Sequence, residues 1–273
     1  MRRVVFRCGL YSSPAAHVQR YSDIALGTLV RALSEVNASY LRSHPQTPTL
    51  HRAGVATHAA LDTSGTWSAI PQLLEAGEGS RIDMACWRIA ELLVQEQSAD
   101  LVRRAAEVAA HEALQGAIRG QWDGAITMVV RLFDRESARQ HSERSLQAML
   151  NALSFIDSAY LATHPRTTPL YGSGVRYQAE RYPAEEWRAI PVLHAAGQGD
   201  CEDLACARVA ELVVREREAA RPTFRFRRLN GAGEPDISGR FSLYHILVER
   251  PGGVIEDPSA LLGMGGSPWA VSS

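Results

Sequence analysis

The feature that most constrains the fold of this chain is an internal repeat. Residues 32–92 (the first repeat segment) align without a gap to residues 152–212 (the second repeat segment), and about 27 of roughly 61 aligned positions are identical. The shared residues include a His-Pro pair, a Gly-Val pair, a tryptophan shortly before Ile-Pro, and a Gly-x-Gly stretch. Chance alignment yields far fewer identities. The repeat therefore predicts two homologous units, with boundaries expected at 1–122 and 123–273.

Both units have the pattern of helices followed by irregular chain. Apolar residues return every three or four positions in 26–41 and in 146–161, which indicates amphipathic helices. Each pattern stops at His-Pro, because the residue before a proline is pushed out of the helical region. A further helix is expected to begin at the Gly-x-Gly stretch, with Cys201 directly before its first turn in the second unit.

The C-terminal part of the second unit has strand character instead. Apolar and polar residues alternate there, and turn-forming residues at 230–236 and 251–253 separate the alternating stretches. These stretches are 223–229, 240–250 and 254–259. They predict a small antiparallel sheet, and the whole chain therefore predicts an α+β fold with helices packed on that sheet.

Composition excludes several classes of protein. The formal net charge is −1 and arginines are scattered among acids, so we expect no nucleic-acid partner. No apolar run approaches the roughly 18 residues that span a bilayer, and the N-terminus lacks a secretory signal pattern, so we expect no membrane partner and a cytoplasmic or particle-associated location. The chain contains no lysine. The simpler explanation for the lack of lysine is a GC-rich genome that favours arginine codons. The alternative is that an acyl-transfer enzyme without lysine amines cannot cross-link itself through them.

Four cysteines are too few and too unevenly spaced for the disulfide framework of a secreted scaffold, and we expect free thiols. They are Cys8, Cys86, Cys201 and Cys206.

The repeat also serves as an internal comparison, because positions at which the two units differ sharply are candidates for chemistry kept by one unit. Cys201 aligns with Arg81, so the first unit has no thiol there, whereas Cys206 aligns with Cys86 and is predicted to be a core residue. Asp203 aligns with Asp83 and is predicted to cap the helix.

Cys201 is expected at a helix N-terminus, where unpaired N–H groups favour the nucleophilic thiolate. Gly197 and Gly199 would allow a tight turn before it. The neighbouring Asp200 and Glu202 oppose ionisation of the thiol, so a cationic partner is required. Without such a partner, Cys201 is a buried or incidental cysteine.

His245 and Asp257 supply the candidate partner. His245 lies in the middle of a predicted strand, on an apolar face that is costly for an imidazole without a polar contact. Asp257 follows the turn at 251–253 and would come beside the ring, where it would fix the tautomer and stabilise imidazolium. The alternative is a core histidine bonded to backbone and an Asp-Pro turn. The first unit, with its AITMVVRLF stretch, has neither residue.

Three motifs, GDCEDLA, YHILV and IEDPS, together resemble the transglutaminase-like superfamily of papain-type cysteine enzymes, in particular the versions encoded among bacteriophage structural and tail genes. The resemblance spans about Tyr171 to Met264, and reaches the first unit only through the repeat. It implies Cys201 as nucleophile, His245 as general base and acid, and Asp257 as the orienting group. It also implies papain/transglutaminase-like units, of which the first is degenerate and serves in packing or recognition.

The expected function is cysteine-dependent acyl transfer, with hydrolysis of a peptide or isopeptide bond through a thioester as the first choice. Amine transfer, as in transglutaminases, is the second choice. The competing class is a catalytically silent structural or assembly protein. Expected partners are a protein or peptide substrate and the proteins of a phage or phage-like particle.

No cofactor or metal is expected. The glycine-rich stretches lack the residues that hold phosphates. Four residues are of types that bind zinc, but their spacing matches no familiar zinc-ligand pattern: Cys201, Cys206, His164 and His194. Trp187 could line a substrate groove, but Trp67 occupies the same place in the first unit, which favours a core role for both.

Overall fold

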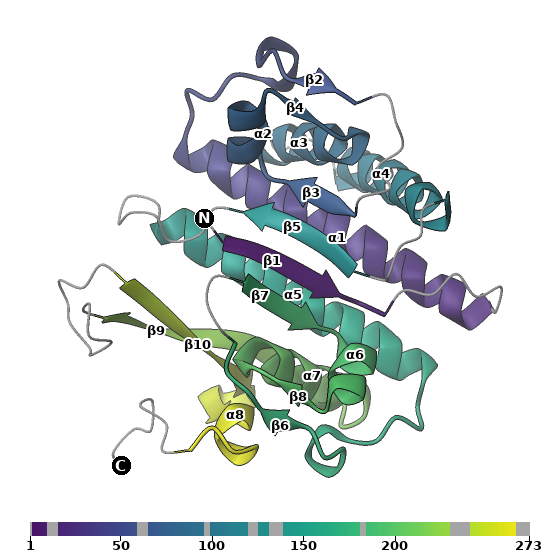
Figure 1. The fold of residues 1–273 in the computed structure, drawn as a ribbon, viewed down its shortest axis with the longest axis vertical. Helices are drawn as coiled ribbons and strands as arrows, with labels where there is room; N and C mark the ends of the chain where they lie inside the picture. The colour runs from purple at the N-terminus through teal and green to yellow at the C-terminus, as the bar shows by residue number, and fades with distance from the viewer. Residues whose placement is uncertain are drawn as a thin grey trace. The chain divides into compact units, whose positions relative to one another are not determined.

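The computed structural model describes residues 2–9, 16–58, 65–95, 99–119, 125–130, 139–180, 184–229 and 241–265. Helices and strands are both abundant, which confirms a mixed α+β fold (Figure 1). Contacts divide the chain into unit 1, comprising Met1–Ala152 and Arg181–Trp187, and unit 2, comprising Leu153–Glu180 and Arg188–Ser273. The predicted division between residues 122 and 123 falls outside the described residues and stays a prediction about the repeat.

Unit 1 contains a four-stranded sheet with the strand order β3-β5-β1-β7. Its strands are β1 (Arg2–Arg7), β3 (Thr66–Ser68), β5 (Ala125–Val130) and β7 (Ala184–Arg188). Strand β5 runs antiparallel to β1, with Phe6 opposite Ile126, and parallel to β3, with Trp67 opposite Met128. The AITMVV stretch therefore belongs to the sheet of unit 1. Both predicted core tryptophans are buried, and the Trp187 ring lies 5.3 Å from that of Phe6.

Three helices of unit 1 pack against one another: α1 (Ala16–Ser43), α3 (Arg81–Val94) and α4 (Ala99–Arg119). Helix α1 contains the predicted helix 26–41, and its apolar stripe is buried at Leu26, Leu29 and Leu33. It ends at the residue before His44-Pro45, as the sequence predicts.

The remaining elements of unit 1 connect α1 to α3. They are the 3₁₀ helix η1 (Leu50–Arg52), β2 (Ala56–Thr57), α2 (Ile70–Ala76) and β4 (Glu78–Gly79). Strands β2 and β4 form a short parallel pair.

Unit 2 repeats this connection and adds a sheet. Helix α5 (Arg139–Thr163) enters unit 2 at Leu153. It is followed by η3 (Leu170–Gly172), β6 (Arg176–Tyr177), α6 (Ile190–Ala196), β8 (Gln198–Gly199) and α7 (Cys201–Val214).

The C-terminal sheet of unit 2 is antiparallel with the order β11-β10-β9, which confirms the predicted small antiparallel sheet. Its elements are β9 (Arg221–Leu229), β10 (Phe241–Arg250), the 3₁₀ turn η4 (Pro251–Gly253), β11 (Val254–Glu256) and the short helix α8 (Pro258–Leu261). The third strand of the sheet ends at Glu256 instead of reaching residue 259. Figure 1 shows β9 beside β10. The predicted turn at 230–236 lies outside the described residues. Helix α7 packs on β10 and on α8, so the sheet and the start of α7 are neighbours.

Aligned residues of the two repeat segments make the same hydrogen bonds. The side-chain oxygen of Asn37 accepts from the Ile70 amide at 2.9 Å, and that of Asp157 accepts from the Ile190 amide at 2.7 Å. Glu91 accepts from the amide of Leu50 at 2.7 Å. In the second segment, Glu211 accepts from the amide of Leu170 at 2.6 Å. Polar side chains thus accept hydrogen bonds from the otherwise unpaired N–H groups at the starts of η1 and α2 in the first segment, and of η3 and α6 in the second.

Candidate functional site

Cys201 is the first residue of α7, which confirms the predicted helix start. Gly197 ends α6 with a φ of 66°, a left-handed conformation that costs a glycine little. Gly199 lies against Asp203, since a Cβ at Gly199 would come within 2.8 Å of Asp203 Oδ2. The tight turn before Cys201 therefore depends on both glycines.

The Asp203 carboxylate links the start of α7 to Arg188, which lies just before α6. Its Oδ2 accepts from the amide of Asp200 at 3.4 Å, as a cap does. Its Oδ1 accepts from the amide of Arg188 at 2.7 Å, and the Arg188 guanidinium lies 3.2 Å from Oδ2. Asp83 bonds the aligned amides of Ser80 and Ser68. Asp203 therefore belongs to the scaffold that both repeat segments share.

His245 and Asp257 form a direct pair. His245 lies in β10 with only 3% of its surface exposed, and its Nε2 is 2.9 Å from Asp257 Oδ2. Asp257 is the N-cap of α8, and its other oxygen, Oδ1, accepts from the Ala260 amide at 3.2 Å. The helix start thus holds the carboxylate in place while it contacts the imidazole. This is the arrangement that fixes a histidine tautomer.

Cys201 lies near β10. The backbone of Ile246, the residue that follows His245, acts to lower the pKa of the Cys201 thiol. Helix α7 packs on β10. The structure therefore pairs His245 with Asp257, and it places Cys201 at the start of the helix that packs on the strand of His245.

The charges around Cys201 oppose ionisation of its thiol. Burial raises the pKa of Cys201 well above its ordinary 9.0, and the carboxyl groups of Glu202 and Asp200 raise it further. The thiol donates to Glu202 Oε2 at 3.2 Å. Burial also raises the pKa of Asp200, and the neighbouring Glu202 and Asp203 add to that effect. The resting sulfur is therefore a protonated, hydrogen-bonded thiol at neutral pH.

The Asp257 carboxylate is stabilised in its charged form. Burial raises its pKa, but the hydrogen bond from His245 and the charge of the ring outweigh burial and leave the pKa below its ordinary 3.8. Asp257 thus keeps a negative charge beside the imidazole across the neutral range.

Tyr177 is a further residue of the site, which the sequence analysis missed. It stands opposite Gly199 in the β6–β8 pair, and its amide donates to the Leu262 carbonyl at 3.0 Å, just beyond α8. Burial raises the pKa of Tyr177 to about 12, with further contributions from Cys201 and from carboxyl groups that include Asp257. The phenol therefore lies near the nucleophile candidate as a neutral group. Its signal in the sequence is the mismatch with Thr57, the aligned residue.

The first repeat segment has none of this chemistry at the aligned positions. Ser80 stands where Asp200 does and forms a capping box with Asp83. Arg81 replaces the cysteine and Ile82 replaces Glu202. After α3 the chain continues as α4 rather than as a strand that could carry a histidine.

The other three cysteines and the zinc-ligand candidate His164 lie outside this set of site residues. Cys206 is fully buried, as predicted, and so are Cys8 and Cys86. His164 stacks on Tyr160 with ring centroids 4.3 Å apart. Within the described ranges, no three His, Cys, Asp or Glu residues are grouped so that they could hold a metal ion.

A scan against protein-family models, a search of curated proteins and a search of solved structures each find no match to this chain. Among the described helices, none is long and apolar enough to cross a membrane.

Proposed function

We propose that unit 2 is a cysteine-dependent acyl-transfer enzyme of the transglutaminase-like, papain-type class, and that it hydrolyses a peptide or isopeptide bond. Cys201 is the nucleophile, His245 is the general base and acid, and Asp257 orients the imidazole. We further propose that the repeat segments derive from one duplicated unit, and that the first copy has lost the chemistry. Arg81 stands in place of the cysteine, so the first copy has no thiol at this position.

The reaction has two steps. His245 takes the Cys201 thiol proton as sulfur attacks the carbonyl carbon of an amide, so a C–S bond forms, and the same proton passes to the leaving nitrogen as the C–N bond breaks. Water then attacks the thioester with His245 as base, which releases a carboxylic acid and restores the thiol. The N–H groups in the first turn of α7 are suited to stabilise the oxyanion in both steps.

The observation that carries this proposal is the His245–Asp257 pair, on the strand against which the helix of Cys201 packs. Because Nε2 pairs with Asp257 at 2.9 Å, we assign the proton exchange with Cys201 to Nδ1. The packing of α7, which begins at Cys201, on β10, which carries His245, supports this assignment. The raised pKa of Cys201 favours proton transfer during attack over a preformed thiolate.

The substrate is proposed at the level of class. A protein or peptide amide suits the chemistry, and no observation marks a site for an amine acceptor, so amine transfer stays second. Association with a phage or phage-like particle, and a cytoplasmic or particle-associated location, stay predictions from the resemblance.

One observation favours a catalytically silent assembly protein instead. Cys201 donates to Glu202 at 3.2 Å, and burial together with two carboxyl groups disfavours its thiolate. If His245 cannot accept the proton, this thiol is inert. The two functions differ in whether the reactivity of Cys201 depends on His245.

The rate of iodoacetamide alkylation at each cysteine, measured by peptide mass spectrometry between about pH 5 and pH 10, separates them. Cys8, Cys86 and Cys206 are fully buried, so burial alone would make them less reactive than Cys201. Selective modification of Cys201 therefore does not by itself distinguish the two functions. We expect His245→Gln to lower the Cys201 rate at pH 7 by at least about tenfold, because general-base assistance is lost. In that variant the rate should recover only above pH 9, where the thiol itself ionises.

His194→Gln is the matched control, since His194 is a partly buried histidine of α6 with no contact to the three residues in the described structure. It should leave the pH profile unchanged. A Cys201 rate that is the same in wild type and His245→Gln at every pH would rule out the enzyme and favour the assembly protein.

A further inference from the structure

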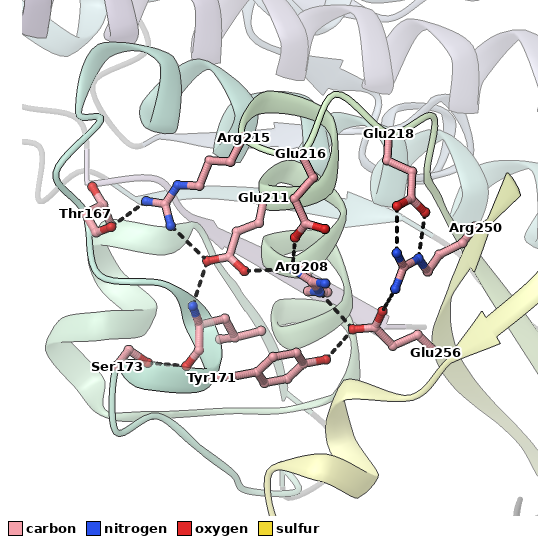
Figure 2. A network of polar contacts seen from close by, with 11 residues as sticks. Thr167, Tyr171, Ser173, Arg208, Glu211, Arg215, Glu216, Glu218, Arg250 and Glu256 are labelled. Carbon is pink, nitrogen blue, oxygen red and sulfur yellow. Dashed lines mark hydrogen bonds and ion pairs between the residues drawn. The ribbon is translucent and has the colours of Figure 1, made fainter.

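A network of charged side chains surrounds Glu256, the last residue of β11 and the direct neighbour of Asp257 (Figure 2). Three donors contact its carboxylate. Tyr171 Oη and Arg208 Nε donate to Oε1 at 2.5 and 2.8 Å, and Arg250 Nη1 donates to Oε2 at 3.1 Å. Both carboxylate oxygens are therefore held.

The centre of the network is largely shielded from solvent. The side chains of Glu256 and Arg208 are only 13% and 12% exposed. Burial raises the pKa of Glu256, but the hydrogen bonds from Tyr171 and Arg208 outweigh it and leave the pKa below its ordinary value. Glu256 thus stays charged, and its ion pairs are stronger than exposed pairs are.

The two arginines connect Glu256 to the elements that bear the other site residues. Arg208 lies on α7, which begins at Cys201, and also contacts Glu211 at 3.4 Å and Glu216 at 2.7 Å. Arg250 ends β10, which carries His245, and pairs in bidentate fashion with Glu218 at 2.6 Å for both contacts. One carboxylate therefore links α7, β10 and β11.

Strand β11 has little else to hold it. It has three residues and pairs only with β10 in the described sheet. Val254 and Ile255 are 57% and 42% exposed, so the strand buries little apolar surface. A segment with few buried apolar contacts opens readily unless polar contacts hold it. The position of Asp257 at its end therefore depends on Glu256.

The first repeat segment shows which part of the network is scaffold. Arg88 aligns with Arg208, Glu91 aligns with Glu211, and the Arg88–Glu91 pair is present at 2.7 Å. Arg88 is 48% exposed, and the pair has no third carboxylate partner among the contacts of the described residues. The arginine and its partner are thus common to both segments, and the contact to Glu256 is added in unit 2.

We propose that Glu256 is a positioning residue, which with Arg208 and Arg250 sets the place of Asp257 so that it meets His245 beside Cys201. This inference rests on the proposed function and explains how it is assembled. Catalytic groups must be held within about half an ångström of productive geometry, and a misplaced Asp257 would leave the imidazole unoriented.

The test compares Glu256→Gln and Arg208→Gln with Arg88→Gln, the matched control from the first repeat segment. The probe is iodoacetamide, and the readout is the pH profile of Cys201 alkylation in the full chain. We expect the rate at pH 7 to fall about tenfold or more in the two unit 2 variants, with reactivity shifting toward alkaline pH. Arg88→Gln should match wild type. If the wild-type rate depends on His245, an unchanged profile in Glu256→Gln would overturn the proposal.

A second readout separates this inference from the proposed function. The NMR signal of the His245 Nε2–H proton reports its hydrogen bond to Asp257 without any reaction. We expect fast solvent exchange of this proton in Glu256→Gln and slow exchange in wild type and Arg88→Gln. If Cys201 reactivity does not depend on His245 but this difference is seen, the function fails and the positioning role stands. Equal exchange in all three proteins overturns the positioning role.

Unfolding of the charge variants is checked by circular dichroism. If they melt below the assay temperature, Tyr171→Phe decides, since it removes a single hydrogen bond from a 42% exposed phenol. We expect the Cys201 rate at pH 7 to fall about threefold or more in this variant. A rate equal to that of wild type would contradict the proposal.

Discussion

Asp157 and Asn37 occupy aligned positions and accept the same hydrogen bond, but only Asp157 can ionise. Each accepts a hydrogen bond from the amide that starts the next helix, at Ile190 and Ile70. Both are fully buried, and burial raises the pKa of Asp157 well above its ordinary 3.8. The unfolded chain therefore gives up the Asp157 proton at a lower pH than the folded chain does.

We predict that Asp157→Asn raises the free energy of unfolding at pH 7 by about 1 kcal/mol or more. In wild type, stability falls as pH rises from about 4 through the raised pKa of the folded state, since only the unfolded chain ionises freely there. The variant lacks this loss and should match wild type near pH 4. Urea unfolding at both pH values measures it.

The reverse substitution is the control for this prediction. Asn37→Asp should destabilise the chain at pH 7 and change it little at pH 4. A gain for Asp157→Asn that is the same at pH 4 and pH 7 would show that charge is not the cause.

Individual residues of the site differ in how far the sequence predicts them. Cys201 stands out because the aligned residue is Arg81, and His245 stands out because an imidazole lies on the apolar face of a predicted strand. Tyr177 and Glu256 do not stand out. Their roles depend on the β6–β8 pairing and on a network between three elements, which no spacing in the sequence encodes.

At the scale of elements, the two glycines before α7 act by different means. Gly197 has a φ of 66° and open space around it, so only its conformation matters. A Cβ at Gly199 would lie 2.5 Å from Leu193 and 2.9 Å from the Cβ of Asp203, so close approach matters there.

We predict that Gly197→Ala costs about 1 kcal/mol of unfolding free energy and that Gly199→Ala costs about 2–3 kcal/mol. Gly199→Ala should also slow alkylation of Cys201, because it displaces Asp203 and the start of α7. Urea midpoints and the alkylation rate test both statements. Equal costs for the two variants would contradict the assigned causes.

Elements built from local patterns were predicted well, and those built from distant pairing were not. Helix ends at His-Pro, the start of α7 and the C-terminal sheet follow from proline, glycine and alternating residues near in sequence. The sheet of unit 1 joins β1, β5 and β7, which lie far apart in the sequence. Their short apolar patterns do not reveal their partners, and α4 was not predicted either.

At the scale of the whole molecule, the chain contains the repeated helical connection twice and the residues proposed for catalysis once. Both repeat segments place a capped helix after a glycine turn, but only unit 2 follows it with β9, β10 and β11. We infer that the catalytic proposal depends on this added sheet, which brings His245 and Asp257 to a helix start that the first segment also possesses.

The most direct test of this account is the trapping of an acyl-thioester. Brief exposure to p-nitrophenyl acetate, followed by acid quenching and peptide mass spectrometry, locates any acetyl group. We predict a hydroxylamine-sensitive acetyl group on Cys201 of wild type, which forms and then hydrolyses. It should be absent in Cys201→Ala and strongly reduced in His245→Gln. Absence of acetyl-Cys201 in wild type, or equal acetylation in His245→Gln, would contradict this account.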